Sequence, residues 1–432
     1  MEEEKNRRLD MTKKKTITAA LLGAGIRGAM AYGIYIKKHP EQIRLAAVAE
    51  PDEKRRENVR KMHHLPEENC FSDWRDLMWR KRMADAVIIA TQDAMHYEAA
   101  ICAVEKGYHI LMEKPISNDI EECIHLAQYV KDKKMVFLLC YVLRYSPFYR
   151  KIKELLLQGC IGDLVFIRHS ENIAYWHYAH SFVRGNWNNL SHSCPLILSK
   201  SSHDMDLLLW LSGSDAKSVS SFGELSFFKA ERAPTGAAKR CSQGCPFHKE
   251  CPYNAVRFYL EDGRHKWALR AMTADTSREG IKKALDTGPY GRCVFYCDND
   301  VVDHQIVNIQ FQNGVTASYT VSAFTRDFFR ETTLMGTKGE IRADDLDFKI
   351  RVSTFGSDKA ELFFVDKCDT GHGGGEEGIM RDFVDAIHGE KSLDDLTDIQ
   401  CSLKSHLLAF GAEKARKERR ALDFKEGFDW NI

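Results

Sequence analysis

The chain has 432 residues, which is too long for one ordinary core and predicts two domains. Its 62 Lys and Arg residues balance 62 Asp and Glu residues, and no long run of one charge follows the basic first fifteen residues, so we expect no nucleic-acid partner. No apolar stretch reaches the length of about 18 residues that a membrane span needs, and 13 Cys without a secretory signal indicate a reducing compartment, so we expect a cytoplasmic protein that binds a small molecule and no membrane.

After an N-terminal extension over residues 1–15, strands and helices alternate in residues 16–140. This alternation predicts a parallel sheet with right-handed crossovers. The expected strands lie at 16–22, 43–49, 86–90 and 109–112, and the expected helices at 29–38, 53–63 and 97–106.

The segment Gly23-Ala24-Gly25-Ile26-Arg27-Gly28 lies between the first expected strand and the first helix. In this setting the pattern G-x-G-x-x-G predicts a turn that binds a dinucleotide: Gly23 permits the tight turn, Gly25 lets the backbone approach the pyrophosphate, and Gly28 allows close helix packing. Glu50 ends the next strand, 22 residues after Gly28, where it can accept from the ribose 2′-hydroxyl and would repel a 2′-phosphate, which favours NAD over NADP. Arg55 and Arg56 oppose this preference, although an exposed helix face is the better explanation of these two residues.

Several motifs together resemble the glucose-fructose oxidoreductase, inositol dehydrogenase and MocA family (Gfo/Idh/MocA). The resemblance covers nearly the whole chain except an insertion at about 230–300. The motifs are the glycine turn, Ala90-Thr91-Gln92-Asp93-Ala94-Met95-His96, Glu113-Lys114-Pro115, Arg144-Tyr145-x-Pro147, Gly159-x-Ile161-Gly162, His203-Asp204-x-Asp206 and Gly336-Thr337-Lys338-Gly339.

The resemblance implies an α/β Rossmann domain at 16–140, followed over 141–432 by an α+β domain with a large open, mostly antiparallel sheet. Such open sheets often pair in this family, so we expect a homo-oligomer, either a dimer or a tetramer. The sequence agrees with strands at 164–169, 218–228, 303–311, 315–323 and 331–335, and with helices at 378–388 and 398–419 that pack on this sheet or return to the cofactor domain.

Oxidation of a secondary alcohol needs a base, a positive group and an aligned nicotinamide. Lys114 ends a parallel strand, and in the family this lysine lies beside nicotinamide and substrate. We expect residues 198–207 to open a helix that runs to Leu211, with Ser199 and His203 on one face, and a helix N-terminus favours the neutral imidazole of a base. His203 is therefore the candidate base.

Many relatives have an aspartate where this chain has Ser199, so a carboxylate-assisted relay is in doubt. Lys200 either binds an acidic or highly hydroxylated substrate or points to solvent.

Two sets of binding residues follow. The candidate cofactor-binding residues are Gly23, Gly25, Ile26, Arg27, Gly28, Glu50, Thr91, His96, Glu113 and Lys114. Residues 175–187 are dense in aromatic and hydrogen-bonding groups, which suits a carbohydrate pocket, although several of these aromatics belong to the core. The candidate substrate-binding residues are Tyr141, Arg144, His180, Arg184 and Trp187.

The insertion contains the spacing C-x3-C-x5-C. Thiolates this close on a turn-rich backbone predict a tetrahedral structural zinc, with an iron–sulfur cluster or free thiols as the alternatives. The insertion has few apolar residues, so we expect it to lack a core of its own and to need the metal. The expected ligands are Cys241, Cys245, Cys251 and Cys293, with Cys297 or His248 as other choices for the fourth.

These patterns and the family resemblance together imply an NAD-dependent oxidoreductase that acts on a secondary hydroxyl of a sugar, sugar derivative, cyclitol or glycoside. The first alternative is a glycosidase or epimerase in which tightly bound NAD is recycled through oxidation and elimination. The second is a non-catalytic regulator that binds the dinucleotide.

Overall fold

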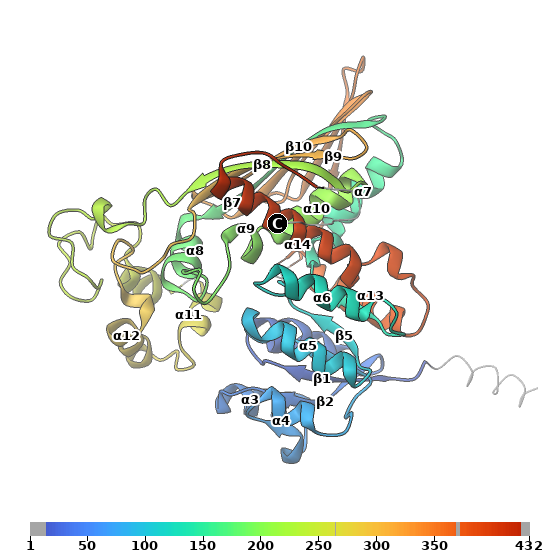
Figure 1. Ribbon diagram of the computed structural model, residues 1–432. Coiled ribbons are helices and arrows are strands. Elements are labelled where there is room, and N and C mark those ends of the chain that lie inside the picture. Colours follow the sequence, from blue (N-terminus) through green and yellow to red (C-terminus); the bar gives the residue numbers. More distant parts are fainter. Residues whose placement is uncertain (1–13, 264, 369–371, 425–432) are drawn as a thin grey trace, which may run out of the picture. The chain divides into compact units, whose positions relative to one another are not determined.

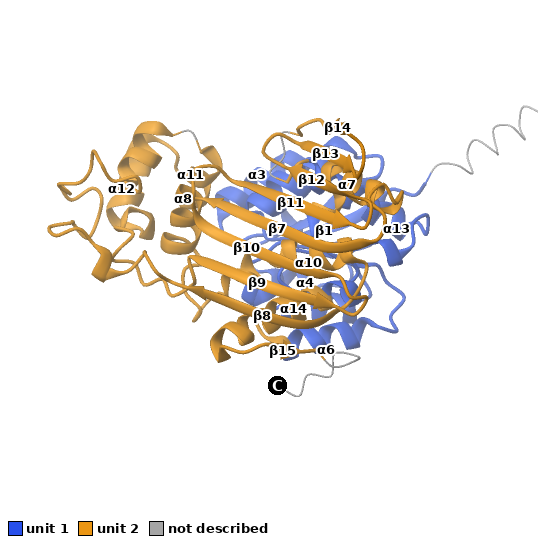
Figure 2. Cartoon of the chain, turned by 90° about the horizontal axis from the view of Figure 1, so that it is seen from above, with its two compact units in different colours: residues 1–117, 121–142, 374–402 blue, residues 118–120, 143–373, 403–432 orange. Residues whose placement is uncertain are grey.

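A computed structural model describes residues 14–263, 265–368 and 372–424, in two compact units (Figure 2). The first unit comprises residues up to 117 with 121–142 and 374–402, and the second comprises 118–120, 143–373 and 403 onward. Most of the expected N-terminal extension lies outside the described residues. The first unit differs from the expected domain at 16–140 because it also takes in 374–402, whose Glu376 pairs with Arg27 at 2.7 Å.

The first unit has a six-stranded sheet in the order β3-β2-β1-β4-β5-β6, with every neighbouring pair parallel (Figure 1). This confirms the expected Rossmann-type sheet. Its strands are β1 (Ile17–Leu22), β2 (Ile43–Ala49), β3 (Cys70–Phe71), β4 (Ala86–Ile89), β5 (His109–Met112) and β6 (Phe137–Leu139).

The three expected helices between residues 16 and 140 are present, with one local difference, whereas the helices at 74–79 and 120–130 were not predicted. The first expected helix is divided into a π-type segment and a short α-helix. The helical segments are η1 (Ile26–Gly33), α2 (Ile34–Lys38), α3 (Glu53–His63), η2 (Glu67–Asn69), α4 (Trp74–Trp79), η3 (Asp93–Met95), α5 (His96–Glu105), α6 (Ile120–Val130), α13 (Gly375–Ile387) and η9 (Leu393–Asp395).

The second unit is built on a nine-stranded sheet in the order β14-β13-β12-β11-β7-β10-β9-β8-β15. Its neighbouring strands are antiparallel except for β7 and β10, which confirms the expected open, mostly antiparallel sheet. All five expected strands are present, whereas β12 to β15 were not predicted. The strands are β7 (Leu164–Ala174), β8 (Ala216–Glu224), β9 (His304–Phe311), β10 (Thr316–Thr325), β11 (Phe329–Gly336), β12 (Gly339–Asp344), β13 (Lys349–Thr354), β14 (Ala360–Phe364) and β15 (Leu422–Asp423).

Helices of the second unit pack on this sheet around a core that includes Ile167, Leu208 and Ile309. The single helix expected from 198 to 211 is wrong, because one helix ends at Ser199 and the next begins at Ser202, with a turn at Lys200 and Ser201 between them. The helical segments here are η4 (Val142–Tyr145), α7 (Pro147–Leu157), α8 (Tyr175–Tyr178), η5 (Ala179–Arg184), α9 (Leu196–Ser199), α10 (Ser202–Ser212) and α14 (Ile399–Glu418), of which η4 and α14 extend into both units.

The insertion has a small apolar core of its own, so the expectation that it lacks one is wrong. Its helical segments are η6 (Ala230–Arg232), η7 (Arg257–Asp262), α11 (Lys266–Met272), α12 (Arg278–Thr287) and η8 (Pro289–Gly291). Ala255, Tyr259, Ala268, Ile281, Leu285 and Tyr290 are buried against one another. Burial of these side chains supplies the stabilisation that we had assigned to a metal.

None of the helices in the described parts of the chain combines the length and apolarity needed to cross a bilayer.

Candidate active site

The glycine turn of the first unit has the geometry expected of a phosphate cradle. Gly23 has a φ of +88°, and a β-carbon there would lie 2.4 Å from the carbonyl oxygen of Ala90. A β-carbon on Gly28 would lie 2.0 Å from the carbonyl oxygen of Gly23, whereas one on Gly25 would meet nothing within 4 Å. Gly23 and Gly28 are therefore required by close backbone contacts within the protein. Gly25, in contrast, borders open space at the start of η1. Ile26, the next residue, is 38% exposed.

Glu50 directly follows β2 and is buried. One carboxylate oxygen accepts the N–H of Ala24 at 2.7 Å, and the other accepts the N–H of Asp52 at 3.1 Å. A carboxylate has about four acceptor positions, so these two bonds leave capacity for ribose hydroxyls. Arg56 donates to the carbonyl oxygens of Glu50 and Pro51 at 2.5 and 3.3 Å, so its guanidinium is already held by the strand end.

Thr91 and His96 connect the loop after β4 to the end of β5. The ring nitrogens of His96 lie 2.6 Å from the carbonyl oxygen of Pro115 and 3.2 Å from that of Thr91, so this side chain braces two loops. The hydroxyl of Thr91 is buried and has no hydrogen-bond partner among the described residues. A buried hydroxyl without a partner is costly, and a bound dinucleotide would satisfy it.

Arg27 and Glu113, both expected to bind cofactor, are paired with each other. Nε of Arg27 lies 2.6 Å from Glu113, and Tyr32 donates to the same carboxylate. Burial disfavours the ionised form of Glu113, but the Arg27 guanidinium outweighs it and lowers the pKa of this carboxyl. The ion pair thus braces the strand end that carries Lys114.

Lys114 is half-buried at the carboxyl end of β5. Its backbone N–H donates to Glu113 at 3.3 Å, and the Lys114–Pro115 peptide bond is cis. Its place at the end of a parallel strand is the place where open α/β sheets bind ligands. Tyr141, expected to bind substrate, is fully buried in the same unit.

In the second unit, His203 is the second residue of α10 and is buried. Its ring centroid lies 5.5 Å from that of His372. Ser199 ends α9 and donates to the carbonyl oxygen of Pro195 at 3.1 Å, so Ser199 and His203 do not share the face of one helix. The position of His203 in the first turn of a helix agrees with the expectation.

Arg144 anchors α10 from the side. Its guanidinium makes two bonds to the Asp206 carboxylate, at 2.6 and 2.7 Å, and Ser405 donates to the same group at 3.1 Å. Both charged side chains are buried. The structure thus gives Arg144, a predicted substrate ligand, an internal partner that fixes the helix of His203.

A buried ionic cluster surrounds Lys200, and we define it as Lys200, Glu171, Arg330, Asp204 and His169. Nζ of Lys200 lies 3.5 Å from Glu171, and Arg330 pairs with Glu171 and, at 2.6 Å, with Asp204. His169 lies 2.8 Å from Asp204. Burial opposes ionisation of Asp204, but the Arg330 guanidinium outweighs it and lowers the pKa of that carboxyl.

Sequence reasoning missed the members of this cluster that lie on strands. A signal was available: residues 167, 169, 171 and 173 alternate along β7 and are all buried, so His169 and Glu171 occupy core-facing positions of a strand. Charged residues at such positions need buried partners, and Arg330 on β11 supplies one.

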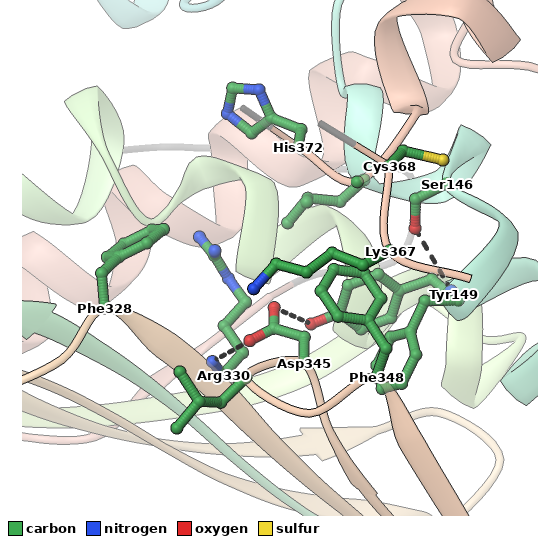
Figure 3. A pocket seen from close by; sticks show the side chains of 13 residues that line it. Ser146, Tyr149, Phe328, Arg330, Asp345, Phe348, Lys367, Cys368 and His372 are labelled. Carbon is green, nitrogen blue, oxygen red and sulfur yellow. Dashed lines mark hydrogen bonds between the residues drawn. The ribbon is translucent and has the colours of Figure 1, made fainter. Parts of the chain in front are cut away.

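A cavity of about 160 Å³ adjoins this cluster (Figure 3). Lys367 extends into it toward Arg330 and Asp345, and burial raises the pKa of Asp345 to about 6 although Arg330 opposes this. His372, next to His203, and Phe328, whose ring lies 4.5 Å from Nζ of Lys200, also line the cavity. This polar, partly aromatic cavity is therefore lined by neighbours of Lys200 and His203, although neither of these two residues lines it.

The other predicted substrate residues have internal partners. His180 bonds to Tyr259 in the insertion, and burial lowers the pKa of His180 to about 3. Arg184 donates to the carbonyl oxygens of Arg292 and Tyr253, each at 2.7 Å, and Trp187 packs on the main core of this unit. None of the three lines the cavity.

The expected zinc site is not supported, which corrects the prediction. Within the described residues, which include Cys241, Cys245, Cys251, Cys293, Cys297 and His248, no three His, Cys, Asp or Glu side chains come together in a way that could hold a metal. These cysteines are free thiols, and the insertion's own apolar core explains how it is held. The C-x3-C-x5-C spacing was thus not enough to predict a metal site, because spacing along the sequence does not fix the direction of the side chains.

Comparison with known proteins adds to this geometry. Residues 17–141 match the model of an oxidoreductase family with an NAD-binding Rossmann fold (GFO_IDH_MocA), and residues 153–393 match the C-terminal alpha/beta domain of that family. The putative oxidoreductase YteT of Bacillus subtilis is 22% identical over 428 residues, which covers 92% of this chain and 96% of that protein. A 2,7-anhydro-N-acetylneuraminate hydratase of Mediterraneibacter gnavus is 25% identical over 209 residues, about half of either protein (48% and 53%).

Among solved structures, a levoglucosan dehydrogenase in complex with NADH and levoglucosan has a TM-score of 0.69. It is 17% identical, and the match covers 95% of this chain and 99% of that one. At this identity the likeness concerns the fold.

Proposed function

The chain belongs to the Gfo/Idh/MocA family of oxidoreductases, and from this premise we propose that it transfers hydride between NAD and a secondary hydroxyl of a sugar, sugar derivative, cyclitol or glycoside. The observation that carries the proposal is the fit of the first unit to a dinucleotide. Gly25 borders open space, and the Thr91 hydroxyl is buried without a partner among the described residues. Glu50 has acceptor capacity left for an unphosphorylated ribose, which favours NAD over NADP.

We assign the chemistry as follows. When bound, NAD supplies the nicotinamide that takes hydride from the carbinol carbon. Lys114 stabilises the developing alkoxide or takes part in moving its proton, and His203 is the general base that accepts the hydroxyl proton. Lys200 contributes positive charge beside the substrate. Arg27 and Glu113 act indirectly, by holding the strand end of Lys114.

The cavity of the second unit is the proposed place for the substrate ring. It combines hydrogen-bonding groups with the rings of Phe328 and Phe348, which suits a carbohydrate with polar hydroxyls and an apolar C–H face. This support is independent of the glycine turn, since it comes from the other unit.

The test is Lys114→Ala, assayed by NADH absorbance with a panel of sugars and cyclitols that includes levoglucosan and myo-inositol. We expect the wild type to reduce NAD with at least one of them. The variant should lose about 100-fold or more in turnover, in the range of lost acid–base catalysis, while it still binds NAD. Lys134→Ala, a change of an exposed lysine in the same unit, is the matched control and should keep full activity. Full turnover by Lys114→Ala would refute the assignment.

A second candidate is elimination or hydrolysis with a recycled NAD, favoured by the similarity to a protein named as a hydratase of an anhydro sugar. Oxidation acidifies the neighbouring C–H, so a substituent can leave before the carbonyl is reduced again. This function predicts cleavage of an aryl glycoside, or conversion of an anhydro sugar, without added NAD and without net NADH. The leading proposal predicts that neither occurs.

A further inference from the structure

The insertion contains a second cavity, which we call the insertion pocket. Its volume is about 700 Å³. The lining includes three basic side chains, Lys239, Arg240 and Arg292, and two aromatic ones, Phe295 and Tyr296. None of these residues lines the cavity proposed for the substrate ring.

The two arginines of the insertion pocket lie directly opposite each other on an isolated antiparallel bridge. The hydrogen bonds flank this pair. Cys241 donates its N–H to the carbonyl oxygen of Gly291 at 2.9 Å, and Cys293 donates to that of Lys239 at 2.9 Å. The arginines therefore form a non-hydrogen-bonded pair, in which the side chains leave the same face and come closest together. Like charges at such positions repel, so a negative partner would stabilise the bridge.

Arg240 forms no ion pair within the described ranges of the chain. Its Nη2 donates to the carbonyl oxygens of Leu285, at 2.6 Å, and Gly288. Its Nε is buried and has no hydrogen-bond partner among the described residues. A buried N–H of a charged group is costly to leave without an acceptor, which indicates that this guanidinium has room for an anionic ligand.

The charges around the pocket favour an anion with two negative charges. Asp298 lies 2.6 Å from Arg292, whereas Lys239 is exposed and makes no ion pair with any described residue. The three basic side chains thus exceed this carboxylate by two positive charges. A phosphate monoester carries about −1.5 to −2 charge near pH 7, and its oxygens fit the N–H groups of a guanidinium, whereas a carboxylate ligand carries a single charge.

The aromatic side of the pocket suits the organic part of such a ligand. Phe295 is buried, and its ring packs edge-on against Phe227, with centroids 5.3 Å apart. Tyr296 is half-buried beside it. Apolar and aromatic walls with a few convergent charged groups are typical of sites for small organic ligands.

We propose that the insertion pocket binds an organic phosphate monoester. The phosphate group lies between the two arginines and Lys239, and the organic part lies against Phe295 and Tyr296. This site goes beyond the proposed oxidoreductase function and does not depend on it, because every residue that carries the argument belongs to the insertion.

The first test is calorimetric titration of the full chain with phenyl phosphate, in the presence of NADH so that phosphate binding at the glycine turn does not contribute. We expect binding at one site. Benzoate, which has the same ring and a single charge, should bind about fivefold or more weakly, and inorganic phosphate, which lacks the ring, should also bind more weakly than phenyl phosphate. Absence of phenyl phosphate binding, or equal affinity for benzoate, would overturn the proposal.

The second test places the ligand in the pocket. Arg240→Gln should weaken phenyl phosphate binding about tenfold or more, the effect of lost hydrogen bonds to a charged group. Arg270→Gln, the same change at an exposed arginine of the insertion that does not line the pocket, is the matched control and should keep wild-type affinity.

A further variant covers the case in which Arg240→Gln fails to fold, since Arg240 also holds two backbone carbonyl groups. Lys239→Gln removes an exposed charge and none of these bonds, and it should weaken phenyl phosphate binding about threefold. Wild-type affinity in Lys239→Gln would overturn the placement of the phosphate group, whatever the fate of Arg240→Gln.

Discussion

At the scale of single residues, the glycines of the turn differ in whether an added β-carbon would fit. A β-carbon on Gly28 collides with the backbone of Gly23, while a β-carbon on Gly25 enters open space. Gly28 is therefore needed for the packing of the fold, and Gly25 borders the place proposed for the pyrophosphate.

This contrast makes Gly25→Ala and Gly28→Ala a matched pair. Gly25→Ala should change the free energy of unfolding by less than about 0.5 kcal/mol, the usual effect at an unstrained open position, since its φ of −70° suits alanine. It should weaken NADH binding about tenfold or more, because the methyl group meets the phosphates. Gly28→Ala should lower Tm even without cofactor. Thermal melts and fluorescence titration with NADH measure both effects, and wild-type affinity in Gly25→Ala would contradict this placement of the cofactor.

Two elements of the second unit are held by buried charges. Near the start of helix α10, Asp204 accepts a hydrogen bond from Arg330. Asp206, two residues later in the same helix, accepts one from Arg144. The turn after β12 is fixed by Asp345, which accepts the backbone N–H of Arg330 on β11 at 2.5 Å and lies 3.5 Å from the Tyr149 hydroxyl of α7. Asp345 thus joins two strands and a helix at the cavity.

This junction should make stability depend on pH. Burial raises the pKa of Asp345 to about 6, whereas the unfolded value is about 3.9, so the folded state binds the proton more tightly. The free energy of unfolding should therefore fall as the pH rises from about 4 to about 6 and then level off. Asp345→Asn removes this contribution, so its stability relative to the wild type should improve by on the order of 2 kcal/mol between pH 4 and pH 7. Urea unfolding at both pH values checks this, and an equal difference at both would contradict it.

At the scale of the whole molecule, the candidate residues belong to two separate units. The first unit carries the glycine turn, Glu50 and Lys114, and the second carries His203, Lys200 and the cavity. A ligand stabilises the fold that binds it, so cofactor choice should be visible in the melting of the full chain.

NAD should raise Tm more than NADP at equal concentration, because the carboxylate of Glu50 repels a 2′-phosphate. At about 100 times its dissociation constant a ligand contributes about 2.7 kcal/mol, which corresponds to a shift of several degrees. Glu50→Gln should narrow the gap between the two cofactors. Differential scanning calorimetry measures the four combinations, and an equal or larger shift with NADP in the wild type would show that Glu50 does not select the cofactor.

Local patterns were enough to predict most of the fold. Short apolar runs separated by amphipathic segments specified the parallel sheet, and five strands of the second sheet followed from alternation. The pattern failed at Lys200, where a continuous helix was expected. The backbone turns there, and Ser201 and Lys200 both reach Glu171 on β7, a contact between distant parts of the sequence.

The sequence by itself was enough to predict most strands, the glycine-rich turn and the place of Lys114 at the end of a strand, because each depends on backbone geometry within a short stretch of chain, whereas the open second sheet was implied by the family resemblance. Only the tertiary structure decided which charged and aromatic side chains meet. It paired Arg27 with Glu113 and turned His180 and Arg184 toward the insertion. It also gave the insertion an apolar core where spacing had predicted a metal, because the direction of a side chain depends on the packing of residues far apart in the sequence.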